Sequence, residues 1–96
     1  MHTVIRQYSG SGASELADEI SSQAKGVEAA IRSVPGVISY ALVRTADGCI
    51  SITVCEDKMG ADESVKVAAE FIRNNCTVNA SPPMVSEGET IINFAT

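Results

Sequence analysis

The chain has 96 residues, of which 45% are hydrophobic and 20% are charged. This length predicts one domain over residues 1–96, the composition excludes a disordered chain, and no apolar run approaches the roughly 20 residues of a transmembrane helix. Seven basic residues against twelve acidic residues give a net charge of −5, which disfavours binding to nucleic acid or to an anionic membrane surface.

The cysteines and the N-terminal residues indicate the compartment. Cys49, Cys55 and Cys76 are odd in number and form no C-x-x-C pair, so they predict neither a disulfide framework nor a zinc site. We interpret them as small buried apolar residues. The first ten residues lack the basic patch and the apolar stretch of a signal peptide. We therefore expect a cytoplasmic protein that holds no metal and no cofactor.

The first predicted elements are a strand and a long helix. Residues 3–8 are strand-forming types and end at the Ser-Gly-Ser-Gly loop of residues 9–12. From Ser14 the apolar residues recur every three or four positions as far as Pro35, which predicts one amphipathic helix with Ser14 as its N-cap. Gly26 inside this helix marks a bend or a close packing contact.

Two strands, residues 37–45 and residues 49–56, are predicted to form a hairpin around Asp47-Gly48. Their alternation gives one face of large apolar side chains and one face of small uncharged ones. The large face comprises Ile38, Tyr40, Leu42, Ile50, Ile52 and Val54, and the small face includes Ser39, Ala41, Val43, Cys49, Ser51, Thr53 and Cys55. Because solvated sheet faces normally carry charges, we expect the small face to be buried against a second copy of the chain. A monomer with an open, mildly polar face is the alternative.

Residues 62–76 again show helical periodicity, and residues 84–94 contain a last strand, strongest at residues 90–94. The resulting order is strand, helix, strand, strand, helix, strand. This order predicts an α+β fold of the ferredoxin-like type, with a four-stranded antiparallel sheet, two helices on one face, and the first and third strands in the centre.

The hairpin region resembles a known family. Residues 35–44 (PGVISYALVR), followed by Asp47-Gly48 and the strand at residues 50–54 (ISITV), are similar to the Pro-Gly and hairpin segment of antibiotic biosynthesis monooxygenase-like proteins. The resemblance implies a dimeric α+β barrel, in which two sheets pack face to face. Such proteins include cofactor-independent oxygenases of polycyclic phenols, quinol oxygenases and haem-degrading enzymes.

The chain departs from the pattern that this resemblance implies. Catalytic members often use a tryptophan on or near the third strand, and this chain contains none. The only histidine is His2, outside any predicted helix, so haem degradation is disfavoured.

The candidate catalytic residues are Arg6, Tyr40 and His2. Arg6 lies midway along a strand predicted to be central, where an unpaired guanidinium is costly. It either pairs with a group such as Glu56 or Asn93, or it binds an anionic substrate and stabilises an enolate or phenolate. His2 and Tyr40 are the candidate bases.

The candidate ligand-binding residues are Tyr8, Arg44, Asn93 and Phe71. Tyr8, like Tyr40, either orients an aromatic ligand or belongs to the core. Arg44 lies at the end of a predicted edge strand. It is either a solvated charge that prevents another strand from pairing with that edge, or a residue that binds the ligand. Phe71 is core or pocket wall, and Asn93 lies in the last predicted strand.

Three functions remain open from the residues. The first is a cofactor-independent oxygenase, in which an apolar pocket desolvates a small aromatic phenol or enol so that its anion reacts with oxygen. The second is a non-catalytic dimeric domain that binds a small molecule, favoured by the missing tryptophan and pocket histidine. The third is an amino-acid-sensing regulatory domain, which the absence of an attached enzyme disfavours.

Overall fold

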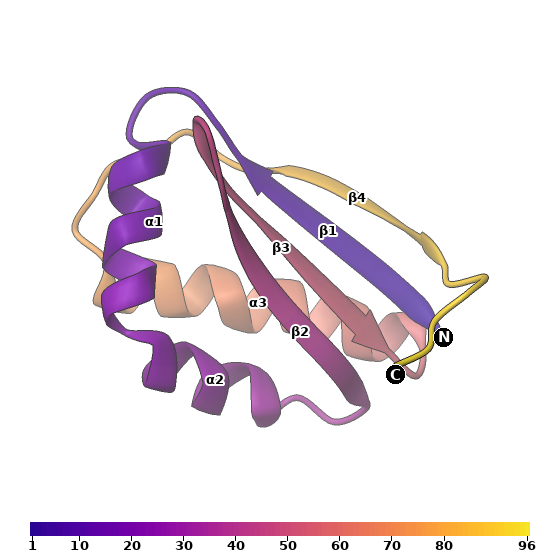
Figure 1. Ribbon diagram of the computed structural model, residues 1–96. Helices are drawn as coiled ribbons and strands as arrows, with labels where there is room; N and C mark the ends of the chain where they lie inside the picture. Colours follow the sequence, from indigo (N-terminus) through magenta and orange to yellow (C-terminus); the bar gives the residue numbers. More distant parts are fainter.

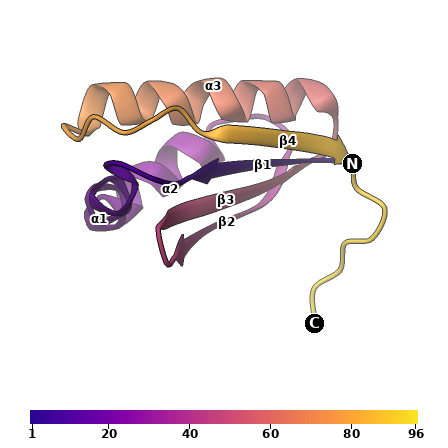
Figure 2. The same cartoon turned by 90° about the horizontal axis from the view of Figure 1, so that it is seen from above.

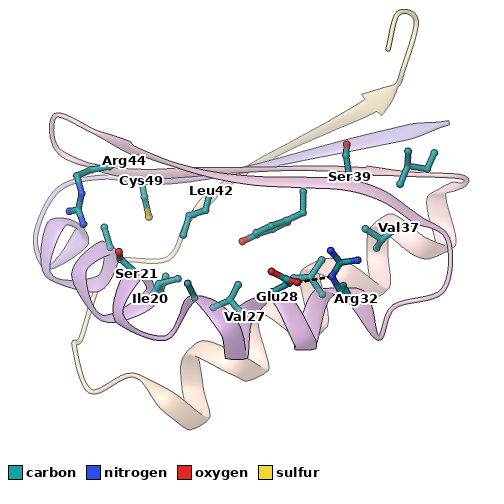
Figure 3. Close-up of a pocket in the computed structure, with 15 residues that line it drawn as sticks. Ile20, Ser21, Val27, Glu28, Arg32, Val37, Ser39, Leu42, Arg44 and Cys49 are labelled. Atoms are coloured by element: carbon teal, nitrogen blue, oxygen red, sulfur yellow. Dashed lines mark hydrogen bonds and ion pairs between the residues drawn. The ribbon is translucent and has the colours of Figure 1, made fainter. Parts of the chain in front are cut away.

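A four-stranded antiparallel sheet carries all the helices on one of its faces (Figures 1 and 3). The computed structural model describes residues 1–96. The elements in chain order are β1 (His2–Tyr8), α1 (Ala13–Ser22), α2 (Ala24–Arg32), β2 (Val37–Thr45), β3 (Gly48–Cys55), α3 (Lys58–Asn75) and β4 (Met84–Glu89). The strand order β2-β3-β1-β4 places β1 and β3 in the centre. The ferredoxin-like α+β fold predicted from the sequence is confirmed.

The first helical region differs from the single helix predicted. It is broken at Gln23, whose backbone leaves the helical region at φ −117° and ψ 29° and whose side-chain amide donates to the Asn75 carbonyl, 2.9 Å away. The N-cap is Gly12, at φ 81°, and not Ser14. Gly26 lies inside α2 as a close packing contact, because an added Cβ would lie 3.2 Å from a ring atom of Phe71. Periodicity alone did not reveal the break, since the apolar stripe continues across it.

The helix α3 starts at Lys58, four residues earlier than predicted. Asp57 caps it by accepting a hydrogen bond from the Gly60 backbone amide at 2.9 Å. The segment that follows α3 is tied back to α1 by the Glu19 carboxylate, which accepts from the Thr77 amide at 2.8 Å and the Val78 amide at 3.0 Å. Hydrogen bonds from the Thr77 side chain and backbone are the main reason that the pKa of Glu19 lies below its usual value.

The faces of β3 are the reverse of those predicted. Ser51 pairs with Arg6 on β1, and both side chains lie on the helix side, only 4% and 5% exposed. Ile52 lies on the outer face, the side away from the helices, and is 37% exposed. An alternating pattern defines two faces but does not say which one the helices cover. Here the helices approach closely, as Ala13 does at Gly48, so the small side chains of β3 face them.

The edge strand β2 contains an irregularity at its start. The register with β3 shifts between Val37 and Ser39, so that Val37 pairs with Cys55 and Ser39 with Val54. This bulge brings Val37 to the helix side, where Leu42 also lies (Figure 3). Tyr40 lines the same cavity as these two residues. Tyr40 and Leu42 therefore face the helices as the sequence predicted, and Val37 joins them.

The last strand ends earlier than predicted. β4 is Met84–Glu89, and the segment 90–94, which has the strongest strand pattern, forms no strand. The pairing of β4 with β1 ends at His2 and Glu89, and the Thr90 amide still donates to the Met1 carbonyl. Ile91, Ile92 and Phe94 are consequently 76–85% exposed. The C-terminal segment leaves the sheet on the side away from α3 (Figure 2).

Cys49 and Cys55 are buried, as predicted, and Cys76 is partly buried, with all three thiols free. Helices with the length and apolar character needed to cross a bilayer are absent.

Candidate functional site

A cavity of about 560 Å³ opens between the edge strand β2 and the pair α1–α2 (Figure 3). We call it the outer cavity. Ten of its fifteen lining residues are hydrophobic. They line it because the helix-facing side chains of β2 and the apolar stripe of α1 and α2 point toward one another. The outer cavity therefore suits a largely apolar guest.

A second hollow of only about 20 Å³, which we call the inner chamber, adjoins the outer cavity toward the centre of the sheet and has room for about one water-sized atom. Five residues line both spaces, namely Ile20, Val27, Ile31, Tyr40 and Leu42. The inner chamber adds Arg6, Tyr8 and Ser51 from the central strands, and Phe71 with its neighbours from α3. A molecule that enters from the side of β2 can therefore reach the polar groups of the central strands.

Arg6 is a buried cation without an anionic partner. It is 5% exposed, and its Nη2 donates to the Tyr8 hydroxyl at 2.5 Å, while its Cζ lies 5.4 Å from the centre of the Tyr8 ring. Its Nε is buried and has no hydrogen-bond partner. Neither Glu56 nor Asn93 pairs with it. Because a buried charge is costly unless it is compensated, this guanidinium is poised to receive an anion.

The two tyrosines beside Arg6 are neutral hydrogen-bonding groups. Burial raises the pKa of Tyr8 and of Tyr40, and the positive charge of Arg6 only partly opposes this effect. Both hydroxyls therefore stay protonated near neutral pH. Since the Tyr8 oxygen accepts from Arg6, its own O–H remains available to donate.

The walls of the outer cavity carry two ion pairs. Arg32 Nε lies 2.9 Å from Glu28 Oε2 within α2, and Arg44 Nη1 on β2 lies 2.9 Å from Asp18 Oδ1 on α1. Three arginines, Arg6, Arg32 and Arg44, line the two spaces, whereas Glu28 is the one acidic residue there. The site is thus cationic although the chain carries a net charge of −5.

The structure brings together most of the candidate residues. Arg6, Tyr8, Tyr40 and Phe71 line the inner chamber, and Arg44 lines the outer cavity. His2 lines neither space: its Nε2 lies 2.8 Å from Glu87 Oε1 in a surface ion pair. Asn93 lies in the C-terminal segment, beyond the last strand.

Ser51, Glu28 and Arg32 are among the lining residues that sequence reasoning missed. Ser51 was missed because its face of β3 was assigned to the outer side. Glu28 and Arg32 were missed although their spacing of four residues on a helix is a recognisable signal for an ion pair.

Comparisons with known proteins agree with this architecture. No protein-family model and no curated protein matches the sequence. Among solved structures, HapK from Hahella chejuensis superposes with a TM-score of 0.72 at 16% identity, over 100% of this chain and 99% of that one.

Two further structures carry a description of their activity. A monooxygenase from the gene ActVA-Orf6 of Streptomyces coelicolor, in complex with the ligand nanaomycin D, gives a TM-score of 0.70 at 16% identity, over 99% of this chain and 91% of that one. SnoaB, a cofactor-independent oxygenase from Streptomyces nogalater, gives 0.66 at 16% identity, over 99% and 97%. At these identities the likeness shows the fold alone. It is the antibiotic biosynthesis monooxygenase-like fold expected from the hairpin segment.

Proposed function

We propose that this protein binds a small aromatic phenol or enol with its ring in the outer cavity and its oxygen in the inner chamber, and oxygenates it without a cofactor, with Arg6 stabilising the substrate anion. The observation that carries the proposal is the buried guanidinium of Arg6, which lies at the deep end of an apolar cavity, has no anionic partner and has an Nε without a hydrogen-bond acceptor. Two proteins of the same fold, a monooxygenase and a cofactor-independent oxygenase, support the choice of reaction.

The chamber favours the ionised form of such a substrate. A phenolate or enolate oxygen beside Arg6 receives one charge-assisted hydrogen bond from Nε and a further hydrogen bond from the Tyr8 hydroxyl. The apolar walls exclude water, so these interactions are stronger than they are in bulk solvent. Both effects lower the pKa of the bound substrate.

Ionisation is the step that makes direct reaction with oxygen feasible. The substrate anion gives electrons to dioxygen, and a carbon–oxygen bond forms to give a peroxide at the activated ring carbon. Where that carbon is a CH₂ group, loss of water leaves a carbonyl, so four electrons pass to dioxygen and one oxygen atom stays in the product. In this reaction the protein positions the substrate, removes water from around it and stabilises its negative charge with Arg6.

The structure bears on where the substrate proton goes. His2 lies outside both spaces, and the raised pKa of Tyr40 disfavours it as a base. We infer that the substrate gives its proton to solvent as it enters the cavity, and that Arg6 holds the resulting anion. The inner chamber holds no side chain that can act as a general base near neutral pH. This equally favours the second candidate function, a non-catalytic domain that binds the same class of molecule.

The test combines binding with oxygen uptake. Binding of 2-naphthol is measured by its fluorescence, and oxygen consumption is measured with an anthrone, whose enol is acidic and whose CH₂ can become a carbonyl. We expect Arg6→Met to lose both signals, Arg6→Lys to retain part of each, and the matched control His2→Gln to retain both. Binding without oxygen uptake selects the non-catalytic function, and absence of binding refutes the site.

We also propose that the chain forms a homodimer through the outer face of the sheet. The register places only uncharged residues there, namely Thr3, Ile5, Gln7, Ser39, Ala41, Val43, Ile50, Ile52, Val54, Met84, Ser86 and Gly88. Ile5, Val43 and Ile52 are 37–47% exposed in the single chain. Covering this face with a second copy removes apolar area from water, and the exposed C-terminal segment extends on the same side (Figure 2).

A further inference from the structure

Arg44 occupies one end of the outer cavity. Its side chain extends from β2 toward α1, at the opposite end from Glu28 and Arg32 (Figure 3). Cys49, the cross-strand neighbour of Arg44, lies beside it in the wall. The guanidinium therefore stands where a molecule lying along the cavity would place its outer end.

The present partner of Arg44 holds it weakly. One contact of 2.9 Å joins Nη1 to Asp18 Oδ1, and the two side chains are 53% and 70% exposed. Exposed ion pairs of this kind contribute little because water and salt screen them. Asp18 does not line the cavity, whereas Glu28, the partner of Arg32, does. The side chain of Arg32 is 77% exposed, so Arg44 is the better enclosed of these two arginines. Its carboxylate partner also lies outside the cavity lining, and Arg44 is therefore the cation there that a guest can recruit.

Arg44 and Arg6 lie on the same side of the sheet at a distance that one aromatic molecule spans. They are two strands and two register positions apart, because Arg44 pairs with Cys49, which pairs with Tyr8. With strands about 4.8 Å apart and about 3.3 Å per residue, the two Cα atoms are roughly 12 Å apart. The charges of both arginines act on the Cys49 thiol, where each opposes the rise in pKa that burial causes.

We propose that Arg44 is a second anion-binding residue, so that the ligand carries a carboxylate or similar acidic group at the end opposite its phenolic or enolic hydroxyl. This inference rests on the proposed function, which places the hydroxyl at Arg6. The carboxylate replaces Asp18 as the partner of Arg44. A ligand of this class is a flat, fused-ring hydroxy acid.

The test uses three probes that differ only in the outer group: 6-hydroxy-2-naphthoic acid, its methyl ester, and 2-naphthol. Dissociation constants are measured by fluorescence titration at low ionic strength. We expect the acid to bind the native protein about threefold to fivefold more tightly than the ester, the range that a partly exposed charge pair gives. In Arg44→Gln this ratio falls to one, while the affinities of the ester and of 2-naphthol stay unchanged.

Two further variants isolate the role of Arg44. Asp18→Asn removes the competing carboxylate, so the affinity for the acid rises and the affinity for the ester does not. Arg32→Gln is the matched control, because it removes an arginine from the opposite end of the cavity and leaves the ratio of acid to ester as in the native protein.

The possible failures are distinct. If 2-naphthol binds and depends on Arg6 but the acid has no advantage over the ester, the inference about Arg44 is refuted and the proposed function stands. An advantage that survives in Arg44→Gln also refutes it. If none of the probes binds, the proposed function fails and the inference fails with it.

Discussion

The two faces of the sheet differ in side-chain polarity, and the difference is the reverse of the one found in most sheets with a solvated face. The face that the helices cover carries Arg6, Ser51 and Thr53, each at most 5% exposed. The outer face carries Ile5, Ile52 and Val43, each more than a third exposed. Polar groups are therefore buried where apolar ones are normally found, and apolar groups lie where charged ones are normally found.

Both the buried polar groups and the exposed apolar groups cost free energy that a single chain without a ligand does not recover. A buried guanidinium without an anion destabilises the fold, and an exposed apolar face leaves hydrophobic area in water. The first cost is recovered when an anionic ligand binds, and the second when another sheet covers the face. The difference between the faces thus separates the residues of the binding site from the residues of assembly.

The largest effect is expected on the outer face. Ile52→Lys places a charge at the centre of the proposed interface, so the dimer should dissociate and the mass measured by analytical ultracentrifugation should fall to that of one chain. Asn74→Lys, which adds the same charge to an exposed position on α3, should leave the mass unchanged. A native protein that sediments as a monomer, or an Ile52→Lys variant that remains a dimer, would contradict the proposed interface.

On the helix-facing side, Arg6→Met should raise stability while it removes ligand binding. Replacing a buried charge that lacks a partner by an apolar side chain of similar length should increase the free energy of unfolding by about 1–3 kcal/mol. Urea denaturation measures this change. Arg6→Lys keeps the charge and should not show the gain. A less stable Arg6→Met variant would mean that Arg6 is compensated in the folded protein.

A smaller effect is expected where α2 meets α3. Gly26→Ala puts a methyl group 3.2 Å from the Phe71 ring, which must shift into the inner chamber. The affinity for 2-naphthol should fall about threefold to tenfold, whereas the gain in helix propensity, about 1 kcal/mol, offsets the strain in stability. Adding Phe71→Leu should restore binding. Gly88→Ala, at a glycine with open space around it, is the control and should not change affinity.

The smallest effect is expected at Glu19, whose carboxylate joins α1 to the segment that follows α3. Its pKa is lowered in the folded protein, so its stabilising contribution is complete above the unfolded-state pKa and is lost as pH falls through the folded-state pKa. Glu19→Gln should therefore lower the hydrogen-exchange protection factors of the Thr77 and Val78 amides at neutral pH, and protonation of Glu19 at low pH should lower the same protection factors in the native protein. Glu15→Gln serves as control. Equal exchange in both variants would show that the carboxylate does not hold this segment.

The sequence predicted the topology because apolar periodicity and turn residues are local signals. The spacing from Leu16 to Val34 indicated a helix, and Asp47-Gly48 indicated the hairpin, which the structure confirms. The break at Gln23 was not predictable, since it depends on a hydrogen bond to Asn75, fifty-two positions away. Which face of β3 is covered was missed for the same reason, because it depends on how closely the helices pack.

The candidate site was predictable only in part. Arg6 attracted attention because a charge in a central strand is unusual, and its position in the inner chamber follows from the strand order. Ser51 has no such signal, since a serine in an alternating strand is equally common on either face. His2 has a reactive side chain, but it lies at the end of β1, where its ring contacts the Glu87 carboxylate and not either hollow.

The C-terminal segment has a consequence for handling the protein. Residues 90–96 (TIINFAT) carry no charge and no proline, have high strand propensity, and present Ile91, Ile92 and Phe94 to solvent. Such a segment is a template for intermolecular cross-β pairing when it is left uncovered. The purified protein should therefore form fibrils slowly when it is stored at high concentration, and removal of residues 91–96 should prevent this.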